Sequence, residues 1–112
     1  MAGDAQPGLT VLVTGATGFI GRRLVPALAQ RGVTVKAMTR NPDEYAGPGA
    51  AIYGDVHDPG SLAEALTGVD VAIYLVHSLD HSDFERKDAD AARGFGLAAA
   101  ATGVRQIVYM GG

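Results

Sequence analysis

The stretch VLVTGATGFIGRRL, from Val11 to Leu24, places three glycines three residues apart directly after a run of apolar residues. The residues before the glycines, LTVLVT, are rich in β-branched types that favour a strand, and those after them repeat apolar side chains with a helical period. Glycine is costly inside either element because it loses the most conformational freedom on folding. The chain therefore needs unobstructed backbone where this strand meets this helix.

The rest of the chain alternates strands and helices in the same way. Continuous apolar strands joined by helices are typical of a parallel sheet with right-handed crossovers. The strands are expected at residues 9–14, 33–38, 50–54, 70–76 and 105–110, and the helices at 18–31, 59–67 and 82–102. Pro26 should bend the first helix without ending it, and residues 41–49 form a loop with room for one helical turn. The sequence thus predicts an α/β fold with a parallel sheet of five strands. In a doubly wound sheet of the Rossmann type, the expected order of these strands is 3-2-1-4-5.

The fifth strand, which contains QIVYM, would lie at the edge of this sheet with apolar side chains on both faces. Exposed apolar edges promote aggregation. We therefore expect the fold to be truncated after strand five, as the N-terminal part of a longer domain. Alternatively, a protein partner or a second copy of the chain, in a homodimer, covers that edge.

Composition narrows the class of protein. The chain has 112 residues, a net charge of −3 and no cysteine, which excludes disulfides and is typical of the cytoplasm. No apolar run reaches the roughly 20 residues of a membrane span, and the first residues lack the pattern of a secretory signal. Residues 1–40 carry five basic groups against one acidic, and the remainder carries four against eleven. The glycine stretch lies in the positive part of the chain, where it would favour an anionic ligand; the alternative is a chance clustering of surface charges. The overall charge does not favour nucleic-acid binding.

A strand, then Gly15, Gly18 and Gly21, then a helix is the arrangement that holds a dinucleotide pyrophosphate. The first glycine permits a tight turn, the second lets the backbone approach the phosphates, and the third lets the helix pack closely on the strand. The helix N-terminus adds free N–H groups and a partial positive charge. Thr14 and Thr17 add hydroxyls that can fix the loop or reach the phosphate. The alternative is a tight strand-to-helix turn that binds nothing.

The motif TGATGFIG resembles the fingerprint of extended and atypical members of the short-chain dehydrogenase/reductase superfamily. GDVHDPGSLAEALTGVDVAIYLVHS continues the resemblance, and YLVHS and GVRQIVYMGG are most similar to atypical, NmrA-like members described as NAD(P)H-binding. The resemblance covers residues 9–112 and implies that they form an NAD(P)-binding Rossmann domain, with residues 1–8 as a flexible leader. Sugar-nucleotide epimerases, NmrA-type regulators and an accessory subunit of respiratory complex I share this fingerprint.

The resemblance also implies a binding role for particular positions. The pyrophosphate should lie over the glycine loop, whose cofactor-binding residues are Gly15, Ala16, Thr17, Gly18, Phe19, Ile20 and Gly21. At the end of the second strand, an acidic residue would bind the ribose 2′-hydroxyl of NAD. This chain has Arg40 there and no carboxylate until Asp43. A guanidinium can grip a phosphate with two parallel hydrogen bonds, so we expect NADP in preference to NAD. The alternative for Arg40 is a solvated loop arginine.

Two further segments match the rest of the cofactor site. Asp55 and Val56, after the third strand, correspond to the pair that contacts adenine, with Asp55 as a simple turn residue being the alternative. Leu75, Val76 and His77, after the fourth strand, would flank the ribose next to nicotinamide. A histidine there can donate a proton near neutral pH, but such a residue more often bonds only to its neighbours.

We expect no metal site. Asp80, His81 and Asp83 form a cluster of metal-ligating types, which is better interpreted as the N-cap region of the long helix. His57 lies in a loop with no paired acidic residue that the sequence identifies.

Catalytic members of the superfamily use a Tyr-x-x-x-Lys pair, in which lysine lowers the pKa of the tyrosine for proton exchange. No such pair occurs in these residues, so we expect no catalytic residue among them. Two hypotheses follow. The chain is the cofactor-binding part of an NADP-dependent oxidoreductase, epimerase or dehydratase, or it is a non-catalytic module that senses NADP(H) or assists assembly. The enzyme would act on a small-molecule substrate, which the sequence does not identify, and the non-catalytic module would bind a protein partner.

Overall fold

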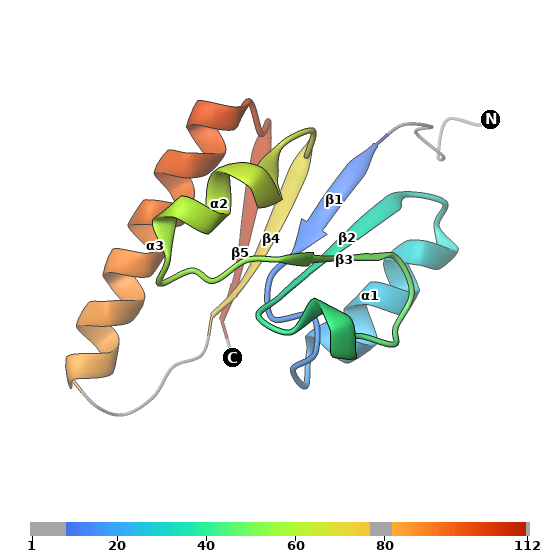
Figure 1. The fold of residues 1–112 in the computed structure, drawn as a ribbon, viewed down its shortest axis with the longest axis horizontal. Helices are drawn as coiled ribbons and strands as arrows, with labels where there is room; N and C mark the ends of the chain where they lie inside the picture. The colour runs from blue at the N-terminus through green and yellow to red at the C-terminus, as the bar shows by residue number, and fades with distance from the viewer. Residues whose placement is uncertain (1–8, 77–81, 112) are drawn as a thin grey trace.

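The computed structural model describes residues 9–76 and 82–111, and these form one parallel sheet with helices on both faces (Figure 1). The strands are β1 (Thr10–Val13), β2 (Thr34–Thr39), β3 (Ala50–Tyr53), β4 (Val71–Val76) and β5 (Gln106–Gly111). The helices are α1 (Gly21–Gln30), α2 (Pro59–Leu66) and α3 (Ser82–Thr102), with a short 3-10 helix, η1 (Pro42–Glu44). The strand order is β3-β2-β1-β4-β5, so the predicted topology is confirmed. The expected leader, residues 1–8, lies outside the described residues.

The start of the first helix differs from the prediction. The helix was expected from residue 18, but α1 begins at Gly21. The residues between β1 and α1 form a separate turn, in which the Gly18 N–H donates to the Gly15 carbonyl oxygen at 3.0 Å. Gly15 has a φ of 60°, a left-handed conformation that rarely suits other residues. This turn occupies Gly15 to Gly18, and the regular helix begins only after it, at Gly21. Pro26 lies inside α1, which continues past it to Gln30.

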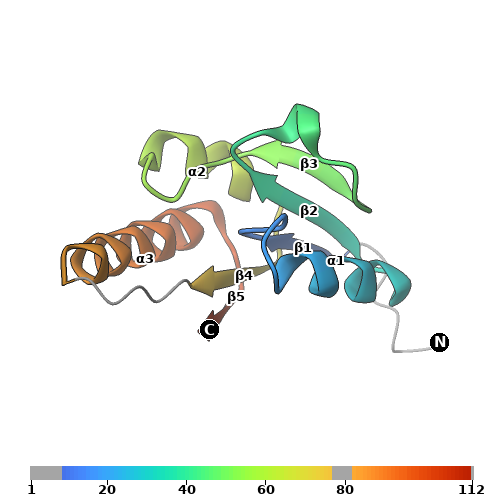
Figure 2. The ribbon, with the colours of Figure 1, turned by 90° about the horizontal axis from the view of Figure 1, so that it is seen from below.

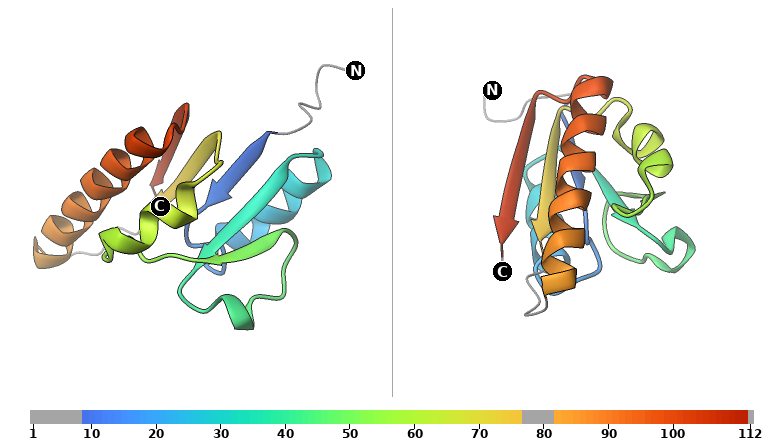
Figure 3. Two further views of the ribbon diagram at one scale, coloured as in Figure 1. Left: turned by 45° about the horizontal axis from the view of Figure 1, so that its top comes forward. Right: turned by 90° about the vertical axis from the view of Figure 1, so that its left-hand side faces the viewer.

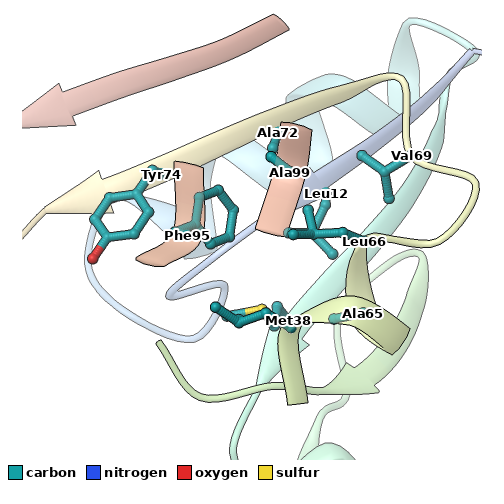
Figure 4. Packing of buried hydrophobic residues seen from close by; sticks show 10 residues of the cluster. Leu12, Met38, Ala65, Leu66, Val69, Ala72, Tyr74, Phe95 and Ala99 are labelled. Carbon is teal, nitrogen blue, oxygen red and sulfur yellow. The ribbon is translucent and has the colours of Figure 1, made fainter. Parts of the chain in front are cut away.

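Two apolar cores hold the layers together. On one face of the sheet, α2 and α3 pack over β1, β2, β4 and β5 (Figure 2, Figure 3). Phe95 of α3 is fully buried there and meets Tyr74 of β4 edge to face, with ring centroids 4.9 Å apart (Figure 4). On the other face, α1 places Val25 against Val13 and the rest of a second cluster. The central strand β1 is therefore covered on both sides, as its continuous apolar sequence predicts.

The edge of the sheet formed by β5 is less covered by helices than the central strand. β5 pairs with β4 alone among the described strands. Val108 and Met110 are only partly buried on the α1 side, and Tyr109 on the α3 side is 51% exposed. The predicted edge position of this strand is confirmed, and its apolar side chains face solvent in part on both sides.

We predict that residues 1–112 alone self-associate through β5, because exposed apolar edge strands pair with other chains. Light scattering should give a mass above that of the monomer. Val108→Lys adds a charge to this strand and should reduce the association. Leu97→Lys adds the same charge at an exposed position of α3 and should leave it unchanged. A stable monomer of the unmodified chain would contradict the prediction.

Candidate functional site

A cavity of about 360 Å³ lies at the carboxyl ends of four strands. Its lining residues come from the ends of β1, β2, β3 and β4 and the loops that follow: Thr14, Gly15, Thr17, Gly18, Met38, Thr39, Arg40, Asn41, Gly54, Asp55, Val56, His57, Tyr74 and Leu75. Ligand sites have volumes of roughly 300–1,000 Å³, and in open α/β sheets they lie at this edge, where the strand order reverses. The cavity therefore lies where the glycine motif predicts a ligand.

The glycine loop forms the floor of this site next to α1. Gly21 is buried, and a Cβ atom at this position would lie 2.2 Å from the Gly15 carbonyl oxygen and 2.8 Å from the Ala16 Cα. Both contacts are with backbone, which cannot move aside as a flexible side chain can. The loop and the first turn of α1 are thus pressed together, in agreement with the packing role expected for the third glycine.

The same loop presents unused hydrogen-bond donors. The Arg22 and Leu24 N–H groups donate to carbonyl oxygens at the start of the helix. In the described part of the chain, the N–H groups of Phe19 and Ile20 have no acceptor, and Ile20 at the N-cap makes no side-chain cap bond. Free N–H groups at a helix N-terminus, together with the helix dipole, favour a bound anion.

Thr14 connects the glycine loop to β4. Its side chain is buried, its N–H donates to the Ile73 carbonyl oxygen, and its Oγ1 accepts a hydrogen bond from the Leu75 N–H, both at 3.0 Å. This hydroxyl fixes the loop, as expected, and it also holds the end of β4 beside it. Leu75 lines the cavity. Val76 ends β4, and His77 lies outside the described residues, so its expected role stays a prediction.

Arg40 follows β2 on another side of the cavity. Thr39, just before it, accepts a hydrogen bond from the Asn41 N–H at 3.1 Å, which shapes the turn that carries the arginine. The Arg40 side chain is exposed, and it forms no ion pair or hydrogen bond with the described residues. A guanidinium with unused donors at the rim of a cavity is available to an anionic ligand.

Asp55 and Val56 follow β3 and also line the cavity. One carboxylate oxygen of Asp55, Oδ1, accepts a hydrogen bond from the His57 N–H at 2.9 Å. Asp55 is thus the turn residue that the alternative interpretation expected. Within the described residues, its Oδ2 has no partner, so the turn leaves one oxygen for a ligand.

Ala16, Phe19, Ile20 and Gly21 were predicted to bind the cofactor but do not line this cavity. Ala16 and Gly21 are buried, Ile20 is partly buried, and the Phe19 ring is 63% exposed. The Arg23 guanidinium lies 4.0 Å from the centre of that ring. Ala16 and Gly21, which are buried, could therefore contact a ligand in this cavity only through their backbone.

The cavity also contains residues to which the sequence assigned no role. Met38, Asn41, Gly54, His57 and Tyr74 all line it. Gly54 is buried, and a Cβ atom there would lie 2.5 Å from the Met38 side chain. The sequence indicates that these lining residues lie at or just after the ends of strands. Which of them face the cavity depends on the direction of each side chain in the folded sheet.

A second, smaller cavity of about 250 Å³ lies between α1 and the loop after β2. It is lined by Ala16 and Thr17 of the glycine loop, Arg22, Val25 and Pro26 of α1, and the residues Glu44, Tyr45, Ala46, Gly47 and Pro48. The Tyr45 hydroxyl donates to the Pro48 carbonyl oxygen at 2.6 Å, and burial raises the pKa of this phenol. The phenol thus remains protonated near neutral pH and closes the loop on itself.

Among the described residues, no group of three or more histidine, aspartate or glutamate side chains is placed to hold a metal ion. Asp80 and His81 of the cluster noted in the sequence lie outside those residues, so its interpretation as an N-cap region stays a prediction. No helix in the described part of the chain combines the length and apolar character of a membrane span.

Comparison with known proteins agrees with this geometry. A ceramide reductase from Caulobacter vibrioides is 35% identical over 96% of this chain and 36% of its own length. The photosystem II assembly factor Ycf39 of Cyanophora paradoxa is 38% identical over 58% of this chain and 22% of its own length. The chain thus spans about a third, or less, of the length of these curated relatives.

A solved structure shares the fold. A short-chain dehydrogenase/reductase superfamily protein from Agrobacterium tumefaciens, solved with bound NAD, superimposes with a TM-score of 0.72 at 28% identity, over 89% of this chain and 31% of its own. The family model described as NAD(P)H-binding matches residues 15–112, which begin at the first glycine of the motif. The chain therefore belongs to the NAD(P)H-binding family, within the short-chain dehydrogenase/reductase superfamily.

Proposed function

We propose that this chain binds NADP(H) in the cavity at the carboxyl ends of its strands, with the pyrophosphate on the glycine loop. The observation that carries the proposal is the pair of N–H groups without acceptors, on Phe19 and Ile20, at the N-terminus of α1 beside a cavity of about 360 Å³. The buried Gly21 lets α1 pack closely on the glycine loop, and Gly15 and Gly18 of that loop line the cavity. These residues fit a dinucleotide, whose diphosphate needs backbone donors rather than side chains.

The remaining contacts follow from where the strand ends lie. Asp55 and Val56 would receive the adenine, with the free carboxylate oxygen accepting from its amine. Leu75, Val76 and His77 would flank the ribose of the nicotinamide. The bound coenzyme would supply hydride chemistry, and the protein would supply its binding and orientation.

The preference for NADP over NAD rests on charge. Arg40 is the charged residue among those at the end of β2 that line the cavity, and no acidic residue of β2 or of the turn up to Asn41 opposes it. A 2′-phosphate would meet a guanidinium with unused donors, whereas a 2′-hydroxyl would not find the carboxylate that NAD-binding members use. NAD remains the second candidate, because the similar Agrobacterium tumefaciens protein was solved with it.

Titration of the full chain with NADPH and NADH, followed by fluorescence, tests this function. We expect saturable binding of both coenzymes, with NADPH bound about tenfold more tightly, which corresponds to about 1.4 kcal/mol. Equal affinities would contradict the NADP preference, and no binding of either coenzyme would contradict the function itself.

We favour a role in an NADP-dependent reductase, with epimerase and dehydratase activities as related alternatives, because a ceramide reductase matches nearly the whole chain. A non-catalytic sensing or assembly module is the second candidate, and similarity to a photosystem II assembly factor supports it. A Tyr-x-x-x-Lys pair within about one helix of β5 in the full protein would favour the enzyme. Cytoplasmic localisation and homodimer formation are further predictions, which fractionation and the mass of the full protein would test.

A further inference from the structure

Ser61, in the first turn of α2, makes several close polar contacts with the loop that follows β3. Its Oγ accepts a hydrogen bond from the Asp55 N–H at 3.0 Å. The same hydroxyl donates to the Asp58 carbonyl oxygen at 2.7 Å, with the Asp55 carbonyl oxygen at 3.2 Å as a second acceptor. One side chain thus contacts both ends of the turn from Asp55 to Asp58.

The turn is closed by backbone bonds as well. The Asp58 N–H donates to the Asp55 carbonyl oxygen at 2.8 Å, and the Ser61 N–H donates to the Asp58 carbonyl oxygen at 2.9 Å. Asp58 occupies the N-cap position of α2, but its side chain makes no cap bond. The Ser61 hydroxyl therefore joins the first turn of α2 to the loop that follows β3.

These bonds fix the backbone of Asp55, and the position of that backbone sets the direction of the Asp55 carboxylate. The Oδ1 atom is held by the His57 N–H, and the Asp55 N–H is held by Ser61. Asp55 and Val56 line the cavity, but Ser61 does not. Ser61 is thus placed to act on the cavity through Asp55 and not by touching a ligand.

We propose that Ser61 is a positioning residue that sets recognition of the adenine ring, by fixing the Asp55 carboxylate and the Val56 backbone toward the cavity. This inference rests on the proposed function, in which the Asp55 carboxylate accepts from the exocyclic amine of adenine. Without the hydroxyl, the Asp55 N–H loses its acceptor, and the turn keeps only its backbone bond to α2. The backbone of Asp55 is then held less firmly, and its carboxylate is less well aligned with the cavity.

The test compares NADPH with reduced nicotinamide hypoxanthine dinucleotide phosphate, in which a carbonyl oxygen replaces the adenine amine. The full wild-type chain should prefer NADPH by about tenfold, because the carboxylate cannot accept a hydrogen bond from that carbonyl. Ser61→Ala should weaken NADPH binding by about five- to tenfold and leave the hypoxanthine analogue nearly unchanged, so that the preference disappears.

Two variants separate positioning from general stability. Ser61→Thr keeps a hydroxyl and, unlike Ser61→Ala, should retain the preference for NADPH over the hypoxanthine analogue. Thr67→Ala removes a hydroxyl that donates to the Ala63 carbonyl oxygen at 2.8 Å, at the other end of α2, and should keep the wild-type preference.

The outcomes distinguish this inference from the proposed function. If Ser61→Ala retains the wild-type preference for adenine, or loses affinity for both coenzymes equally, the positioning role is wrong. If the wild type binds NADPH without preference over the analogue, the adenine contact of Asp55 is wrong, and the positioning role is wrong with it. If the wild type binds neither coenzyme, the proposed function is wrong.

Discussion

Gly21→Ala is expected to destabilise the chain by about 3 kcal/mol and to abolish coenzyme binding, because the added methyl group has no space. The new Cβ atom would lie 2.2 Å from the Gly15 carbonyl oxygen and within 2.9 Å of two backbone atoms of Ala16. Relief requires α1 to move away from the glycine loop. That movement displaces the N–H groups of Phe19 and Ile20, which are the proposed donors to the pyrophosphate.

Gly94→Ala is a matched control for this substitution. Gly94 also lies inside a helix, α3, but a Cβ atom there meets nothing within 4 Å. The same change should therefore stabilise the chain by about 0.5–1 kcal/mol, since alanine is the better helix former. Urea unfolding followed by circular dichroism would measure both effects. A Gly21→Ala variant with the stability and NADPH affinity of the wild type would show that the loop does not depend on this close contact.

Arg40→Ala is expected to weaken NADPH binding by about 10- to 100-fold, since hydrogen bonds to charged groups contribute about 1.5–3 kcal/mol. The NADH affinity should change by less than about twofold, because NADH lacks the 2′-phosphate. The Arg40 side chain is exposed and unpaired among the described residues, so its removal should leave the free energy of unfolding nearly unchanged.

Arg31→Ala provides the charge control for Arg40. Arg31 is also exposed, and it lies at the C-terminal end of α1, away from the glycine loop at the N-terminal end. Its removal changes the net charge equally and should leave both affinities at wild-type values. Fluorescence titration at two salt concentrations would add a second readout, because added salt should weaken NADPH binding more than NADH binding in the wild type. An equal loss of both affinities in Arg40→Ala would contradict a contact with the 2′-phosphate.

Much of the site could be predicted because strand ends can be recognised from sequence. In a parallel sheet, every strand has its carboxyl end at the same edge, so residues that follow different strands meet there. This rule was enough to bring Gly15, Arg40, Asp55 and Leu75 to one cavity, although they are far apart in the sequence. The order of the strands also agrees with the order expected for the Rossmann-type fold that the glycine motif resembles.

The contribution of individual side chains could not be predicted in the same way. The sequence left open whether Asp55 is a turn residue or a ligand contact, and the structure places one carboxylate oxygen in the turn and leaves the other free among the described residues. Nor does the sequence show that the side chain of Asp58, at the N-cap of α2, makes no cap bond, whereas the hydroxyl of Ser61 bonds to the loop. Such a choice depends on distances of a few tenths of an ångström within a folded turn.

The sequence by itself determined the class of fold, the strand order and the segments that surround the cavity, because apolar periodicity and glycine spacing are local properties of the chain. Only the tertiary structure decided that α1 begins at Gly21, that Thr14 joins the glycine loop to β4 and that Ser61 joins Asp55 to α2. These are contacts between atoms brought together by packing, and packing depends on the whole set of neighbouring side chains rather than on any one segment.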